Sequence, residues 1–310
     1  MRIRKFLARI GVVGLALTAT AGVWAALPAE AAQRPQPITT CGQAITRATA
    51  YLTRDLTCTQ GFNVPSNADG IKDISIDLRG HRLQGTGTGT AFSVGNVVPL
   101  FASLALKNGR IDHWGTAVST SWASTTLTNL TLDHNALALH CGGLSNCTVS
   151  DSRIEYNTVG TTTIEAGLVF TGNVFRGNGI ASKASSVGEI SGVTYTDNWF
   201  EANTVGVSIA PNIQVRLDGN RFSGNVVGVK GIDPDGFGAF QVMLTNNRFS
   251  TNRDGISLAL RADNGYAVLQ GNVATRNTRY GIYAPRATDA GGNRASGNGR
   301  PCVGVVCGRS

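Results

Sequence analysis

Asparagines recur from residue 135 onward at nearly constant spacing, and this spacing limits the folds that the chain can adopt. Eight asparagines are separated by 22, 21, 25, 22, 27, 25 and 21 residues. An apolar residue stands three positions before each of them. The eight are Asn135, Asn157, Asn178, Asn203, Asn225, Asn252, Asn277 and Asn298. A period of about 23 residues is typical of a solenoid, in which each repeat stacks on the one before.

The residues before and between the asparagines predict short strands. Ile74, Ile76 and Leu78 alternate with polar residues, which is the pattern of a strand with one buried face. The 39 glycines and the many β-branched residues oppose helix. A propeller blade needs a repeat of about 40 residues or more, and a sandwich lacks a strict register. We therefore expect an all-β solenoid with one triangular coil per repeat and about ten coils.

Equivalent residues of successive coils lie above one another in such a stack, about 4.8 Å apart. The asparagines should then form a ladder of hydrogen-bonded side-chain amides. An inward aromatic stack is expected from Phe175, Phe200, Phe222 and Phe249. A second polar column stands two residues before the apolar positions and comprises Asn173, Asn198, Asn220, Asn247, Asn272 and Asn293.

Residues 1–31 have the features of a secretory signal peptide. Four basic residues precede an apolar segment, and Ala29-Glu30-Ala31 forms a small-x-small cleavage signal. We therefore expect a secreted, extracellular protein with no membrane contact after cleavage. Removal of four basic residues and Glu30 lowers the formal net charge from +8 to about +5. This charge permits attraction to an acidic polymer, but it is lower than expected of a nucleic-acid-binding protein.

Six cysteines in a secreted chain predict disulfides, and six cysteines allow fifteen connectivities. Three pairs are close in sequence, and proximity favours them: Cys41 with Cys58, Cys141 with Cys147, and Cys302 with Cys307. We expect residues 32–37 to be a linker and residues 38–310 to be one domain, acting as a monomer. Within it, residues 38–70 would cap the stack, residues 71–298 would form the coils, and residues 299–310 would close the far end.

The cap around Cys41 and Cys58, the strand from Ile74 to Gly85 and the Asn-x-x-Gly coils together resemble a known group of proteins. They are similar to secreted bacterial right-handed parallel β-helix proteins of the pectate-lyase-like superfamily. The resemblance covers about residues 38–310. It implies a right-handed single-stranded parallel β-helix, but not an activity, because the repeated residues are structural.

One column of the stack is charged over only a few coils. Two residues before each ladder position it contains Asp112, Asp133, Glu155, Arg176 and Glu201, and it then continues with serine and threonine. Because the preceding apolar residue points inward, this column should point outward. The adjacent column begins with His113, His134 and Tyr156, and two arginines, Arg110 and Arg153, stand nearby. We name Asp112 to Glu201, with these neighbours, the charged strip.

The charged strip has two interpretations. Stacked carboxylates of different coils bind a hard cation such as Ca²⁺, or they serve as the two carboxyl groups of a glycoside hydrolase. The resemblance to superfamily lyases implies Asp133, Glu155 and Glu201 as Ca²⁺ ligands and Arg176 as the base. Alternatively, the strip is the balanced surface of a soluble protein. No lysine falls in it, and the polygalacturonase-like pattern of an Asp pair with His/Arg-x-Lys is absent.

Some features outside the strip point to ligand binding. Trp199 should face outward beside an inward phenylalanine and would offer a platform for a sugar ring, whereas Trp114 should be packed. Tyr156, Arg110 and Arg153 are further substrate-binding candidates. Two stretches, 179–188 and 230–238, lengthen their coils and predict loops. The sequence favours binding of extracellular or cell-wall polysaccharide without evident catalysis. It leaves open a lyase, epimerase or hydrolase acting on an acidic polysaccharide through the charged strip, with Ca²⁺ as the cofactor.

Overall fold

A computed structural model describes residues 34–64, 73–95, 102–186, 191–210, 212–232, 240–259 and 265–309. The predicted signal peptide lies outside them, as do Asp233 and Asp235 of the second predicted loop. The described residues contain strands and turns but no helix, and accordingly none of their segments is a helix able to cross a membrane. Residues 34–310 form one compact unit, and the fold described below is that of this unit.

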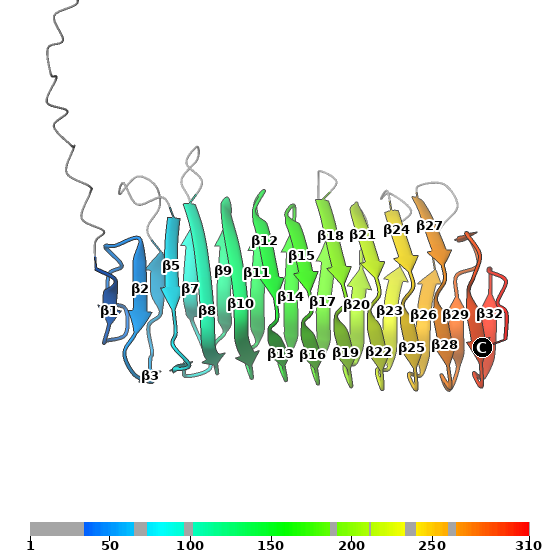
Figure 1. The fold of residues 1–310 in the computed structure, drawn as a ribbon, viewed down its shortest axis with the longest axis horizontal. Helices are drawn as coiled ribbons and strands as arrows, with labels where there is room; N and C mark the ends of the chain where they lie inside the picture. Colours follow the sequence, from blue (N-terminus) through cyan, green and yellow to red (C-terminus); the bar gives the residue numbers. More distant parts are fainter. Residues whose placement is uncertain are drawn as a thin grey trace, which may run out of the picture. The chain divides into compact units, whose positions relative to one another are not determined.

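The unit is a parallel β-helix, as predicted, in which every strand pairs with the equivalent strand of the next coil (Figure 1). Three strands make up each coil, so the stack has three faces. The first face contains β1 (Gln36–Ile38), β2 (Thr49–Leu52), β5 (Asp73–Asp77), the first parts of β8 (Ala102–Asp112) and β10 (Ala123–Asp133), β12 (Asn146–Ser150), β15 (Gly167–Thr171), β18 (Ser191–Thr196), β21 (Ile213–Asp218), β24 (Phe240–Thr245), β27 (Gly265–Gln270) and β30 (Thr288–Asp289).

The other two faces follow in the same order along the chain. The second face contains β3 (Leu56–Thr57), β6 (Arg82–Gln84), the second parts of β8 and β10, β13 (Arg153–Glu155), β16 (Val174–Arg176), β19 (Trp199–Glu201), β22 (Arg221–Ser223), β25 (Arg248–Ser250), β28 (Val273–Thr275) and β31 (Arg294–Ser296). The third face contains β4 (Phe62–Val64), β7 (Thr90–Gly95), β9 (Thr116–Ser121), β11 (Leu137–Gly142), β14 (Val159–Ile164), β17 (Ile180–Ser185), β20 (Val205–Ile209), β23 (Val227–Ile232), β26 (Asp254–Ala259), β29 (Tyr280–Tyr283) and β32 (Arg300–Val303).

The predicted asparagine ladder is confirmed, and it is buried. The side-chain oxygen of Asn203, for example, accepts hydrogen bonds from the backbone N–H and the side-chain amide of Asn178. The amide of Asn203 in turn donates to the carbonyl of Phe175 and to Asn225. The second polar column forms a ladder of the same kind from Asn173 to Asn293. Each ladder therefore satisfies backbone groups at one corner of the coils, which stabilises the turns.

The core between the faces is apolar and stacked. Phe175, Phe200, Phe222 and Phe249 form the predicted column, with ring centroids 4.6–4.7 Å apart and nearly parallel planes. Trp114 is packed inside, as predicted, and is 1% exposed. The three predicted disulfides are all present.

The predicted loops over residues 179–188 and 230–238 start too early, because the first part of each segment is a strand. Ile180–Ser185 is strand β17 and Val227–Ile232 is strand β23, and both pair in register with neighbouring coils of the third face. Alternation of small and apolar residues places these segments in the sheet. The rest of each predicted loop, residues 187–188 and 233–238, lies outside the described part of the chain.

Candidate functional site

The charged strip lies on the second face in the predicted register. Asp112, Asp133 and Glu155 are aligned on neighbouring strands β8, β10 and β13. Arg176 and Glu201 follow on β16 and β19. A second outward column runs beside them and contains Arg82, Arg110, Thr131, Arg153, Val174 and Trp199. The carboxylates and arginines of these coils are therefore neighbours both within a coil and between coils.

The first three carboxylates are buried, although their column points away from the core. Asp112 is 0% exposed, Asp133 is 4% exposed and Glu155 is 8% exposed. Arg82 covers Asp112: its Nε donates to both carboxylate oxygens, at 3.0 and 2.8 Å. This hydrogen bond is the largest cause of a raised pKa at Arg82. The column points outward as expected, but arginine side chains cover its carboxylates in these coils.

The remaining carboxylates of the charged strip are also paired. Arg110 bridges two coils, since its Nε lies 3.1 Å from Asp112 Oδ2 and its Nη2 lies 2.6 Å from Asp133 Oδ2. Arg153 Nη2 donates to Glu155 Oε1 at 2.7 Å. Arg176 Nε donates to Glu201 Oε2 at 2.8 Å, and this bond raises the pKa of Arg176. Every carboxylate in the strip thus has an arginine partner.

The adjacent column of rings lies at the corner after the second face. His113 and His134 stack with centroids 5.4 Å apart, and Tyr156 lies tilted at the same distance from His134. All three residues have φ between 54° and 57°, the left-handed conformation that the corner requires. His134 Nδ1 lies 2.8 Å from Asp133 Oδ2. Tyr156 is 51% exposed and ends this short stack.

This geometry gives little support to metal or base chemistry in the charged strip. The proposed Ca²⁺ ligands do not converge, because the coil that carries Arg176 separates Glu155 from Glu201. Over the described residues, no group of three or more His, Cys, Asp or Glu could hold a metal. A raised pKa keeps Arg176 protonated, which opposes a role as the base. The strip resembles a balanced ion-pair network more than a reaction centre.

Trp199 faces outward as predicted and borders a hollow at the corner between the first and second faces. Its side chain is 41% exposed, and its indole N–H donates to Ser223 Oγ at 3.1 Å. The hollow has a volume of about 450 Å³ and is also lined by Asp197, Arg221 and Gly219. A sugar ring could pack on the indole with polar groups at either side.

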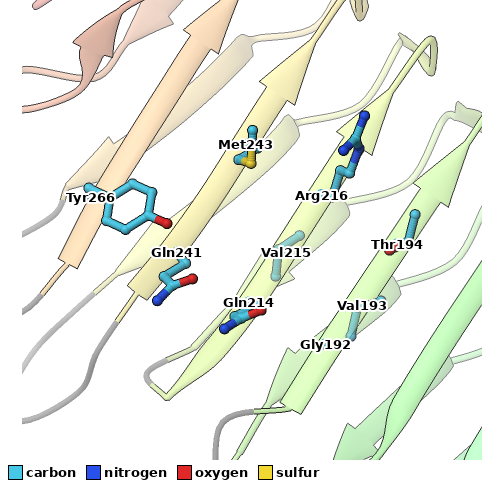
Figure 2. Close-up of a pocket in the computed structure, with 9 residues that line it drawn as sticks. All are labelled: Gly192, Val193, Thr194, Gln214, Val215, Arg216, Gln241, Met243 and Tyr266. Atoms are coloured by element: carbon cyan, nitrogen blue, oxygen red, sulfur yellow. The ribbon is translucent and has the colours of Figure 1, made fainter. Parts of the chain in front are cut away.

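A groove on the first face was not anticipated from the sequence. Gln214, Gln241 and Tyr266 lie in register on the neighbouring strands β21, β24 and β27, and Figure 2 shows these three side chains in one row. Arg216 and Met243 form the next row, in register with Thr194 of β18. The groove has a volume of about 220 Å³. Gly192 leaves its far end open, since a Cβ there would contact nothing within 4 Å.

The groove combines exposed apolar surface with unused polar groups. Tyr266 is 48% exposed and Met243 is 40% exposed. The side-chain amides of Gln214 and Gln241 have no hydrogen-bond partner within the described part of the chain. Arg216 is 3.6 Å from Asp218, at the edge of the groove. Among the described residues that line the groove, none is a carboxylate.

The sequence carried only a weak signal for this groove. The alternation of β21, β24 and β27 indicates which residues point outward, but the row becomes visible only when the coils are stacked in register. The register itself was available, because each of the three residues stands six positions before an asparagine of the second polar column. An exposed tyrosine aligned with two glutamines would have been the feature to seek.

Comparison with known proteins identifies the fold. Residues 101–234 match the family described as right handed beta helix region. No curated protein matches the sequence. The chain is similar to a DFA-IIIase from Arthrobacter chlorophenolicus, with 12% identity over 78% of this chain and 88% of that chain and a TM-score of 0.38. It is also similar to the catalytic domain of a GH87 alpha-1,3-glucanase in complex with nigerose, with 13% identity over 84% of this chain and 62% of that chain and a TM-score of 0.38. At these identities the likeness concerns the fold alone.

Proposed function

This chain is a right-handed parallel β-helix protein, and from that premise we propose that it binds polysaccharide outside the cell without cleaving it. The observation that carries the proposal is the row of Gln214, Gln241 and Tyr266 in the groove of the first face. The tyrosine ring would pack against the apolar face of a sugar ring. The two amides, each able to donate and accept, would bond to neighbouring hydroxyl groups.

The rigidity of the site supports binding. The three side chains project from paired strands of one sheet, so the ligand orders few groups when it binds. Successive coils repeat at about 4.8 Å, which lets one chain contact several coils along the stack. The hollow beside Trp199 lies at the corner next to this face and would add a second contact for a long polysaccharide.

Secretion and domain organisation are part of the proposal. The signal peptide would end at residue 31 and the linker would cover residues 32–37, with the β-helix domain acting as a monomer. Three disulfides support an oxidising compartment such as the cell exterior. Mass spectrometry of the protein from culture medium should give a chain that begins at Ala32, and light scattering should give the mass of one chain.

The test is a panel of neutral and acidic polysaccharides, assayed for binding and for product with and without Ca²⁺. We expect at least one ligand whose affinity falls about tenfold, or 1.4 kcal/mol, in Tyr266→Ala. Tyr156→Ala is the matched control, because Tyr156 is equally exposed but lies in the charged strip. Loss of binding in the control alone would contradict the groove. Reducing ends or unsaturated products would favour the enzymatic alternative.

A further inference from the structure

Beyond Trp199, the second face loses its carboxylates and keeps its arginines. Strands β22, β25, β28 and β31 continue the two outward columns in register. One column contains Arg221, Arg248, Val273 and Arg294, and the other contains Ser223, Ser250, Thr275 and Ser296. Arg276 follows Thr275 at the corner. We name Arg221, Arg248, Arg276 and Arg294 the arginine strip, and all four side chains are exposed.

The arginine strip has no acidic partner. In the described residues, none of its four guanidinium groups forms an ion pair or a side-chain hydrogen bond. Other arginines of the same coils are paired: Arg279 and Arg253 lie beside the buried carboxylate of Asp254. Hydrogen bonding to Asp254 raises the pKa of Arg279. Carboxylates thus neutralise the neighbouring corner but not the strip.

Like charges on stacked coils repel one another. Arg221 and Arg248 are direct neighbours on paired strands, so their backbones lie about 4.8 Å apart. Such a line of cations creates a positive potential that draws in and orients an anionic chain. The alternation of guanidinium and hydroxyl groups adds neutral donors beside each positive charge.

We propose that the arginine strip binds the phosphodiester groups of a polyol phosphate chain. A guanidinium group donates two parallel hydrogen bonds to a phosphate, a geometry that lysine does not supply. Arg221 and Arg248 present this group on neighbouring coils, and Arg294 continues the column beyond Val273, with Arg276 at the corner of the intervening coil. Several phosphates of a flexible chain are therefore bound together. The chemistry is recognition of a polyanion, and the face lies apart from the groove of the first face. Arg221 also lines the hollow beside Trp199, but the groove that carries the proposed function shares no residue with the strip, so Tyr266→Ala and the arginine variants test the two ideas separately.

The residue types in the strip favour a flexible phosphate chain over ring-based polymers. Neither column contains an aromatic residue from β22 onward. Single-stranded nucleic acids are bound through stacking of bases on aromatic side chains, and a sugar ring also needs an apolar platform. In the outward columns the nearest aromatic residue is Trp199, one coil before Arg221, whereas the phenylalanines of these strands are buried. What the strip offers is positive charge and hydroxyl donors, which match phosphates rather than rings.

The experiment measures binding of the purified protein to poly(glycerol phosphate). The variant carries Arg221→Gln, Arg248→Gln and Arg294→Gln, and we expect its affinity to fall at least tenfold. The matched control carries Arg47→Gln, Arg54→Gln and Arg286→Gln, which removes the same charge elsewhere and should change affinity less than twofold. Binding of the native protein should weaken about tenfold from about 50 to 300 mM salt, since salt screens exposed charges.

Equal losses in the two variants would overturn the proposal, because net charge alone would then explain binding. So would unchanged binding in the first variant. Polygalacturonate, single-stranded DNA and phosphatidylglycerol–phosphatidylcholine vesicles are compared at equal charge concentration. Tighter binding to any of them than to poly(glycerol phosphate) would also overturn it. Thermal unfolding of each variant establishes that the fold is retained, as expected for substitutions at exposed side chains.

Discussion

The two halves of the second face have the same backbone but differ in net charge. From β6 to β19 the outward columns contain four arginines and four carboxylates, so their net charge is zero. From β22 to β31 they contain three arginines and no carboxylate, so their net charge is +3. The inner columns continue through both halves. The repeat therefore constrains what points inward, and the outward columns are free to diverge along the stack.

The carboxylates of the first half cannot remain without their arginines. Asp112 is completely buried, and a buried charge without a partner is costly. In the second half, serine and threonine stand in place of the carboxylates. Their hydroxyl groups carry no charge, so they form no ion pairs with the arginines beside them. The arginines there stay solvated. One half is satisfied internally, and the other is open to a ligand.

The largest predicted effect should be the same in both halves, because the asparagine ladder continues beneath both. Asn157 and Asn252 each accept two hydrogen bonds and donate two. Asn157→Ala and Asn252→Ala each leave buried backbone and amide groups unpaired, so we expect losses of about 3–4 kcal/mol. Urea unfolding measures both. If the two losses of unfolding free energy differ by more than about 1.5 kcal/mol, the scale of a single hydrogen bond, then the halves differ in the stability of their asparagine ladder as well as in charge.

The next prediction separates the halves. Arg110→Met leaves the buried Asp133 without its arginine, and we expect a loss of about 2–3 kcal/mol. Arg248→Met removes a solvated side chain with no partner, so its effect should stay within about 0.5 kcal/mol. Both are measured by urea unfolding at neutral pH. Equal effects would show that the ion pairs of the first half contribute nothing to stability.

The features predicted correctly from the sequence are those that repeat. The asparagine ladder, the phenylalanine stack and the buried position of Trp114 all belong to columns in which one residue type recurs, because the interior of each coil presents the same environment. The disulfides followed from proximity along the chain. The fold class could therefore be predicted from periodicity without knowledge of any contact.

Contacts between outward columns could not be predicted in the same way. The register placed Asp112 and Asp133 in one line, but not the reach of Arg82 and Arg110 across coils that buries them. A long side chain chooses among several partners, and spacing does not determine which one. The groove around Tyr266 is still harder to predict, since its row joins two glutamines with a tyrosine instead of repeating one residue type, and only exact stacking brings them together.

A third prediction converts the second half into a copy of the first. Ser223→Asp with Ser250→Asp places carboxylates in the column that holds Asp112 and Asp133 farther up the stack. The new carboxylates should pair with Arg221 and Arg248 while every arginine remains. We expect affinity for poly(glycerol phosphate) to fall about tenfold, with stability changed by less than about 1 kcal/mol. Ser208→Asp with Ser257→Asp on the third face is the control of equal charge. The idea of a free arginine strip fails if the two double variants bind alike.

The smallest predicted effect compares the two ends of the stack. Asp55 accepts from the backbone N–H of Arg82, and Asp289 accepts from those of Val306 and Gly291. These backbone hydrogen bonds lower both pKa values below the ordinary 3.8. A lowered pKa stabilises the fold above pH 3.8, and this contribution disappears as the pH falls through the folded pKa.

Because the pKa of Asp289 is lowered, Asp289→Asn should lose stability relative to the native protein at neutral pH but not in acid. At neutral pH the variant should lose at most about 1 kcal/mol, because the carboxylate is partly solvated. The difference from the native protein should shrink toward zero as the pH falls below the folded pKa of Asp289, which is lower than 3.8, because the native carboxyl group is then also protonated. Asp55→Asn should behave alike at the other end. Urea unfolding midpoints of the variant and the native protein are compared from neutral pH into acid. A difference in midpoint that persists in acid would mean that the substitution alters the structure of the C-terminal closure, and that the charge of Asp289 is not the cause.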